Sequence, residues 1–136
     1  MSAERCVEVQ GGWLAATTSK STGDRAETLA LEHLLSHGLI LVCRNYRVAR
    51  GPHARGGEID LIVRERDGTI VFVEVRSRAS GVFGGALGSV TARKRQRIVL
   101  AARHFLAGLA QLPPCRFDVV AIEGQRVQWL RAAFDA

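Results

Sequence analysis

The sequence predicts one α/β domain in which a central mixed β-sheet is flanked by α-helices. Segments with helical periodicity and β-rich segments follow one another in the order helix, three strands, helix, two strands. Two long helices separated by a strand meander are typical of a sheet with helices packed on it. A chain of 136 residues with 47% hydrophobic residues suits one such core and leaves no room for two.

The first helix is expected over residues 24–37. Residues 1–20 lack clear periodicity and are expected to form a flexible tail, which leaves 21–136 as the single domain. Gly38 ends the helix. The stripe expected to face the core has helical spacing and consists of Ala30, Leu31, Leu34 and Leu35.

The second helix is expected over residues 91–108 and is terminated by Pro113 and Pro114. A basic, glycine-rich loop is expected at 50–57, and a flexible glycine-rich segment at 80–89. The expected strands are the β-rich segments 39–48, 58–65, 69–76, 116–122 and 125–130.

The hairpin formed by the second and third strands carries the informative carboxylates. Gly68 suits the positive-φ position of a three-residue loop between them. This register places Asp60 opposite Glu74 and Glu58 opposite Arg76, with all four side chains on one face. A two-residue loop would instead put Asp60 and Glu74 on opposite faces of the sheet.

Two opposed carboxylates, with Cβ atoms about 4.5–5.5 Å apart, repel each other and destabilise a sheet. The arrangement of Asp60 and Glu74 makes sense if a divalent cation binds between them, since Mg²⁺ prefers oxygen ligands from one or two carboxylates plus water and phosphate. The alternative is that both acids face water and each is offset by a nearby arginine.

Each helix adds one charged candidate to this pair. Glu27 continues the buried stripe of the first helix and is a candidate third carboxylate. Its alternative role is in a capping box, with Asp24 as the N-cap, and both roles are compatible. Lys94 heads the apolar stripe of the second helix, and its alternative is a surface lysine whose stem covers apolar neighbours.

The charge balance points to a polyanionic partner. The chain has 19 Lys and Arg residues against 13 Asp and Glu residues, a net charge of +6. Nearly all the basic residues are arginine, which binds phosphate well, although a biased genome composition produces the same excess. Aromatic residues make up only 6% of the chain, which argues against a base-stacking platform. The candidate nucleic-acid contacts are Arg50, Arg55, Arg78, Arg93 and Arg97.

Other site types find little support in the sequence. Cys6, Cys43 and Cys115 have no zinc-ligand spacing and are expected to be reduced. His33 and His37 are interpreted as surface residues. No segment is apolar enough to span a membrane and no signal peptide is recognisable, so a cytoplasmic protein is expected.

Four motifs resemble the YraN-like family of small bacterial proteins. They are GDRAE at 23–27, GEIDLIV at 57–63, FVEVRSR at 72–78 and RFDVVAI at 116–122. The resemblance extends from Gly23 to Phe134. It implies a restriction-endonuclease-like core, similar to archaeal Holliday-junction resolvases.

The resemblance also implies a Mg²⁺- or Mn²⁺-dependent nuclease acting on DNA, including branched or repair and recombination intermediates. Asp60 and Glu74 match the two acids of the nuclease pattern, Glu27 matches the helical acid, and Lys94 fits a basic residue on the following helix. Arg76 stands where that pattern has lysine. Arginine can stabilise phosphate charge but does not transfer a proton.

Two other functions remain open at this stage. One is a catalytically inactive nucleic-acid-binding module of the same fold, and the other is a protein-interaction domain indifferent to nucleic acid. A homodimer is a further option, because resolvases of this fold act on two strands. Trp129 or the apolar run 132–134 could supply its surface.

Overall fold

The computed structural model describes residues 21–49, 56–78 and 90–136. The expected N-terminal tail lies outside these residues, as do most of the basic loop expected at 50–57 and all of the segment 80–89.

The predicted element order is confirmed. The last strand runs further than expected, to Phe134 instead of residue 130. In chain order the elements are α2 (Ser21–Ser36), β1 (Ile40–Val48), β2 (Gly57–Arg64), β3 (Ile70–Arg78), α4 (Ala92–Ala107), β4 (Cys115–Glu123) and β5 (Arg126–Phe134).

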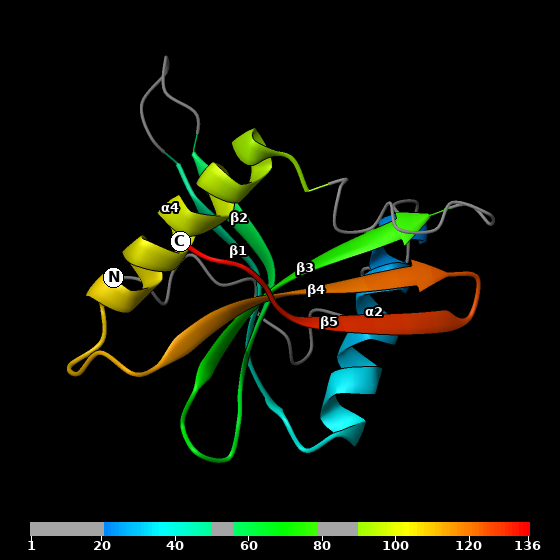
Figure 1. Ribbon diagram of the computed structural model, residues 1–136, viewed down its shortest axis with the longest axis horizontal. Helices are drawn as coiled ribbons and strands as arrows, with labels where there is room; N and C mark the ends of the chain where they lie inside the picture. The colour runs from blue at the N-terminus through cyan, green and yellow to red at the C-terminus, as the bar shows by residue number, and fades with distance from the viewer. Residues whose placement is uncertain (1–20, 50–55, 79–89) are drawn as a thin grey trace.

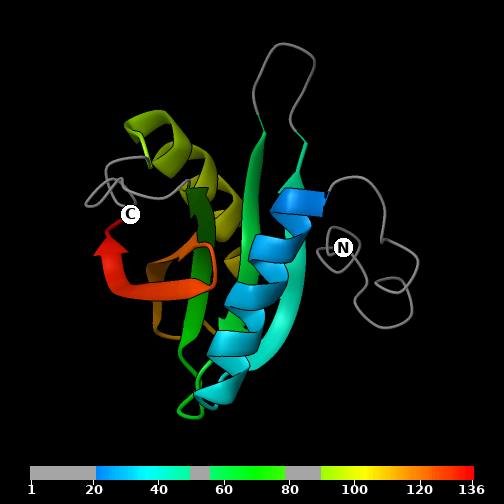
Figure 2. The ribbon, with the colours of Figure 1, turned by 90° about the vertical axis from the view of Figure 1, so that its right-hand side faces the viewer.

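The strands form one mixed sheet in the order β1-β2-β3-β4-β5 (Figure 1). Neighbouring strands are antiparallel except β3 and β4, which are parallel. A parallel pair needs a crossover connection, and α4 provides it. The helices α2 and α4 lie on opposite faces of the sheet (Figure 2).

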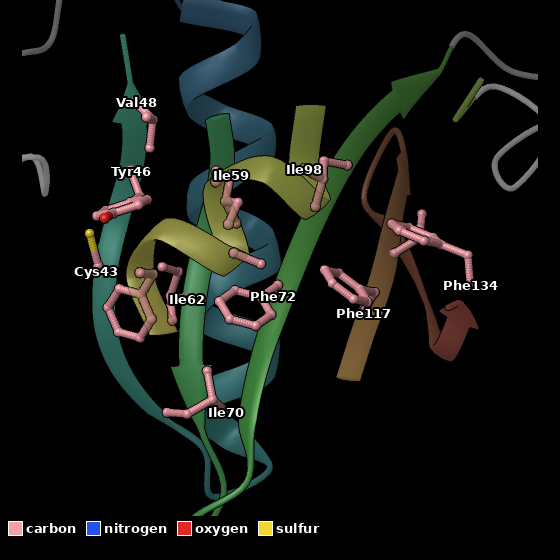
Figure 3. Close-up of a cluster of buried hydrophobic side chains, with 14 of the residues drawn as sticks. Cys43, Tyr46, Val48, Ile59, Ile62, Ile70, Phe72, Ile98, Phe117 and Phe134 are labelled. Atoms are coloured by element: carbon pink, nitrogen blue, oxygen red, sulfur yellow. The ribbon is translucent and has the colours of Figure 1, made fainter. Parts of the chain in front are cut away.

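Each face of the sheet has its own hydrophobic core. On the α4 face, Ile62 and Phe72 (Figure 3) share a buried cluster with Phe105 of the helix. The Phe72 and Phe105 rings meet edge to face with their centroids 6.0 Å apart. On the α2 face, Val73 shares a buried cluster with Leu34. Each helix is thereby packed against its own face of the sheet.

Two expectations for α2 are corrected. Leu35 was placed in the buried stripe, but its side chain is 43% exposed because it lies one step beyond the edge of the face that buries Ala30 and Leu34. Asp24 was a candidate N-cap, but the helix already begins at Ser21, so Asp24 lies inside the first turn and no capping box starts there.

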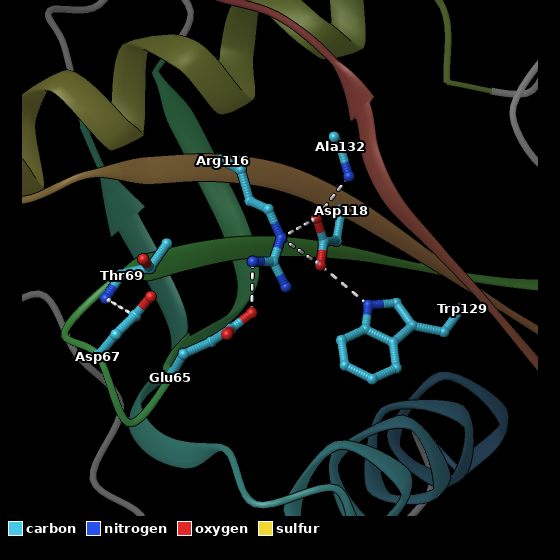
Figure 4. Close-up of polar contacts among 7 residues, drawn as sticks. All are labelled: Glu65, Asp67, Thr69, Arg116, Asp118, Trp129 and Ala132. Atoms are coloured by element: carbon cyan, nitrogen blue, oxygen red, sulfur yellow. Dashed lines mark hydrogen bonds and ion pairs between the residues drawn. The ribbon is translucent and has the colours of Figure 1, made fainter.

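The end of the sheet formed by β4 and β5 is held by a buried carboxylate. Asp118 is fully buried and accepts hydrogen bonds from Arg116 Nε at 3.0 Å, Trp129 Nε1 at 2.9 Å and the Ala132 backbone N–H at 2.9 Å (Figure 4). Arg116 also forms an ion pair with Glu65. The register of β4 against β5 shifts beside Asp118, and Ala132 has a positive φ of 49°.

The C-terminal residues considered for a dimer surface are already engaged within the chain. Phe134 is only 8% exposed and stacks on Phe117. The Arg131 guanidinium lies 4.1 Å from the Trp129 ring centre, and His37 meets the edge of that ring. Phe134 therefore does not offer a free apolar surface.

None of the helices within the described residues is long and apolar enough to cross a membrane. The expectation of reduced cysteines is wrong for Cys43, which is disulfide-bonded, whereas Cys115 is exposed and free.

Gly57 lets α4 approach β2 closely, and replacing it with alanine should be strongly destabilising. A Cβ atom at Gly57 would lie 2.3 Å from the Arg97 carbonyl oxygen and 2.9 Å from the Ala101 nitrogen, so the helix would have to move. Urea denaturation should show a loss of about 2–4 kcal/mol. Gly68→Ala is the comparison, since no atom lies within 4 Å of a Cβ atom at this position and the only strain comes from its φ of +96°. It should cost about 1 kcal/mol, and equal losses would contradict this account of Gly57.

Candidate functional site

The register predicted for the central hairpin is confirmed where β2 and β3 pair. Leu61 lies opposite Val73 and Arg64 lies opposite Ile70. The loop closes with a hydrogen bond from the Glu65 N–H to the Thr69 carbonyl at 2.9 Å. This is the three-residue loop that the sequence predicted, and it brings Asp60 and Glu74 to facing positions one step beyond the paired residues.

The strict alternation expected along β2 does not hold at Asp60. Ile59 packs in the core under α4, whereas Leu61 packs in the core under α2, although residues two apart in a regular strand share a face. The neighbouring strand β1 is irregular at the same level. Its Asn45 has a positive φ of 57° and falls at the step opposite Asp60. The expectation that four charged side chains simply share one face is therefore wrong at this position.

The irregularity turns the Asp60 carboxylate toward β3. Asp60 Oδ2 accepts a hydrogen bond from the Val75 backbone N–H at 2.8 Å, where a regular ladder would use a backbone carbonyl of β2. The side chain of Asp60 thus occupies the space between the two strands. Its charge interacts with those of Glu74 and Glu27.

The electrostatics of Asp60 are unfavourable for an isolated carboxylate. Burial, then the charge of Glu74, raise the pKa of Asp60 to about 7, and a hydrogen bond with Glu74 acts in the same direction. The hydrogen bond from Val75 opposes the rise. The raised pKa of Asp60 is the behaviour expected for a carboxyl group held close to a like charge in a poorly solvated place.

Glu27 has a similar environment on the α2 side. Burial and then the charge of Asp60 raise the pKa of Glu27 to about 7, while Arg44 opposes the rise. The Glu27 side chain is 15% exposed, and its Oε1 atom is buried without a hydrogen-bond partner, although Arg44 Nε lies 3.5 Å away. An acceptor left in this state is costly to the fold and is well suited to a cation.

Cations of the chain cover Glu74, which is only 4% exposed. Arg76 Nη1 lies 3.3 Å from Glu74 Oε2, and Lys94 Nζ lies 3.5 Å from the same oxygen. Four of the residues proposed from the sequence, Asp60, Glu74, Arg76 and Lys94, are thus brought together from β2, β3 and α4. The N-terminal ends of α2 and α4 lie at the end of the domain where β2 starts (Figure 2), which adds positive potential there.

The donor atoms fit a hard divalent cation that keeps part of its water. Asp60 and Glu74 offer paired carboxylate oxygens, and Glu27 Oε1 is an unsatisfied acceptor near them. Within the described ranges no three acidic, histidine or cysteine side chains form a complete ligand set. Mg²⁺ sites commonly use one or two carboxylates, with water and substrate phosphate as the other ligands.

The candidate nucleic-acid contacts are only partly described. Arg50 and Arg55 lie outside the described residues, as does the side chain of Arg78. Arg93 is exposed in the first turn of α4, and Arg97, one turn later, lies 3.5 Å from Glu58. Arg93 and Arg97 therefore lie on the same helix as Lys94, which contacts Glu74 of the acid pair.

Two residues of the site were not given roles from the sequence. Arg44, which falls within the strand expected at 39–48, links β1 to α2 by approaching Glu27 and donating to Thr28 Oγ1 at 3.1 Å. Asn45 was read as an ordinary strand residue. Its one available signal is the residue type, because asparagine adopts the left-handed region more readily than other non-glycine residues.

The raised pKa values predict that the folded state loses stability as the pH rises through about 7. Because Glu27 and Asp60 have folded pKa values above their ordinary ones, the folded chain holds more protons than the unfolded chain between about pH 4 and 7. Urea denaturation should show a decline of more than about 2 kcal/mol from about pH 5 to about pH 8, at roughly 1.4 kcal/mol per pKa unit.

The control is the double variant Glu27→Gln, Asp60→Asn. The pKa of His33 is lowered by burial and then by His37, so His33 makes the folded state more stable as the pH rises, and it does so equally in both proteins. The comparison therefore isolates the two carboxyl groups. Identical pH dependence in the two proteins would contradict the proposed environment of the acids.

Comparison with known proteins identifies the family. The model of the Uncharacterised protein family UPF0102 matches residues 26–122. A UPF0102 protein of Methylibium petroleiphilum is 64% identical over 119 residues, which cover 88% of this chain and 98% of that one. A UPF0102 protein of Paracidovorax citrulli is 58% identical over 126 residues, covering 93% and 91%. The chain belongs to the UPF0102 family, the YraN-like family that its motifs resemble.

Proposed function

We propose that this protein is a Mg²⁺- or Mn²⁺-dependent nuclease acting on DNA. The observation that carries the proposal is the contact between the Asp60 and Glu74 carboxyl groups, held where β2 and β3 separate and next to Lys94 and Arg76. Such an acid pair destabilises the fold, and a divalent cation would relieve the repulsion.

The residues divide the work between cation and phosphate. Asp60 and Glu74 would hold the cation, with Glu27 as a third acid on the α2 side. A divalent cation in such a place lowers the pKa of water and offsets negative charge on a phosphate. Lys94 and Arg76 would orient the scissile phosphate, and Arg93 and Arg97 would hold the strand beside it through their positive charge.

A second candidate function is a nucleic-acid-binding module without turnover. Arg76 favours it, because this residue stands where the nuclease pattern has lysine and its guanidinium contacts Glu74 directly. In this case the acids would form a cation site that supports binding only.

A cleavage assay separates the two functions. Labelled duplex, single-stranded and four-way-junction DNA would each be incubated with the full chain in Mg²⁺, in Mn²⁺ and in EDTA. If the protein is a nuclease, products should form only in a divalent cation, and the DNA form that is cut fastest is the preferred substrate. DNA that is bound in every condition but never cut would establish the binding module instead. Absence of any salt-dependent DNA affinity would reject both.

A further inference from the structure

The carboxylates and cations of the site neutralise one another in the structure. Glu74 Oε2 lies within 3.5 Å of both Lys94 Nζ and Arg76 Nη1, although these two side chains are 36% and 28% exposed. The two side chains proposed to hold phosphate are therefore paired with the carboxylate proposed to hold the cation. Either ligand, arriving alone, has to displace an existing ion pair.

Each ligand alone also meets a charge of its own sign. A divalent cation at Asp60 and Glu74 would add positive charge beside Lys94 and Arg76. A phosphate at Lys94 would add negative charge beside two acids, of which Glu74 is only 4% exposed and Asp60 is partly buried. These penalties are large where water is largely excluded, and they cancel when cation and phosphate are present together.

We propose that the divalent cation and the phosphate backbone of a nucleic acid bind this site cooperatively, through exchange of Lys94 and Arg76 from Glu74 to phosphate. The inference rests on the proposed nuclease function and adds how that site is loaded. By linkage, the cation must raise the affinity for phosphate by the same factor as phosphate raises the affinity for the cation. In the absence of nucleic acid, the ion pairs of Glu74 with Lys94 and Arg76 weaken cation binding without preventing it.

The test measures the affinity of the full chain for a short, fluorescently labelled phosphorothioate oligonucleotide, whose linkages slow cleavage. Anisotropy titrations would be done in EDTA and in millimolar Mn²⁺ at constant ionic strength. The expected result is binding at least about fivefold tighter in Mn²⁺. Divalent cations normally weaken such binding by competing for phosphate, so the expected change is opposite to the nonspecific one. A methylphosphonate oligonucleotide of the same sequence lacks the charge and should show no gain.

Lys94→Met is the diagnostic variant, since it keeps the alkyl stem and removes the charge. In the absence of oligonucleotide it should bind Mn²⁺ more tightly, as measured by the electron paramagnetic resonance signal of free Mn²⁺. Its gain in oligonucleotide affinity on addition of Mn²⁺ should be nearly abolished. Arg103→Met removes an exposed cation further along α4 and should behave like the wild type.

The outcomes separate the inference from the proposed function. Mn²⁺ that binds the protein but does not tighten oligonucleotide binding would overturn the cooperative loading and leave the nuclease proposal standing. A gain of equal size in Asp60→Asn would overturn it also, because the effect would then arise elsewhere. Failure of Mn²⁺ to bind the protein, with or without oligonucleotide, would reject the metal-dependent function itself.

Discussion

Replacing Asp60 by asparagine is expected to lower metal-dependent DNA cleavage by about a thousandfold, and Glu74→Gln should do the same. Both changes keep the size of the side chain and remove one negative charge from the acid pair. A bound divalent cation contributes several kcal/mol to stabilising charge on phosphate, and each 1.4 kcal/mol corresponds to tenfold in rate. Cleavage would be measured as the initial rate of product formation in Mg²⁺.

The DNA affinity of the same variants, measured in EDTA, should change little, because the phosphate contacts are assigned to Lys94 and the arginines. Glu32→Gln is the matched control, since it removes an exposed acid of α2 away from the site and should cut at the wild-type rate. Undiminished cutting by Asp60→Asn would remove this residue from the mechanism. Parallel loss of cutting and of DNA affinity would indicate a damaged fold instead.

Replacing Asp118 by alanine should cause the largest loss of stability, about 3–5 kcal/mol. The carboxylate is fully buried, and its removal would leave the Trp129 N–H, the Ala132 N–H and part of the Arg116 guanidinium without their acceptor (Figure 4). Buried donors that lose an acceptor cost far more than the net value of the bond. The free energy of unfolding would be measured by urea denaturation.

Two variants calibrate the Asp118 prediction. Asp118→Asn keeps one acceptor oxygen and should lose less than the alanine variant. Glu65→Gln weakens only the partly exposed ion pair with Arg116, whose side chains are 22% and 26% exposed, and should cost at most about 1 kcal/mol. A loss below about 1 kcal/mol for Asp118→Ala would show that this network does not hold β4 and β5 together.

The fold was predictable because its signals are local. Helical and alternating patterns located every element, and the loop chemistry of Gly68, with φ of +96°, fixed the hairpin register. That register was enough to bring Asp60 and Glu74 together. Lys94 heads the apolar stripe of the second helix, which placed it on the side of the sheet, where it contacts Glu74.

Other features could not be predicted because they depend on contacts between distant segments. The break in alternation at Asp60 accompanies a single left-handed residue, Asn45, on the neighbouring strand. Asp118 reads as an ordinary strand acid, since two of its three donors come from a strand that begins eight residues later. The close approach at Gly57 depends on where α4 crosses β2, which no local pattern specifies.

The proposed function requires that Asp60 is placed to bind a cation at a cost to the stability of the fold. The most direct measurement is the free energy of unfolding of wild type and Asp60→Asn at about pH 8, each without and with Mg²⁺. Asparagine can still accept the Val75 N–H and can donate to Glu74, so without metal the variant should be more stable by about 1–2 kcal/mol. Mg²⁺ should stabilise the wild type and leave the variant unchanged. A variant that is less stable without metal, with Mg²⁺ acting equally on both proteins, would contradict the account.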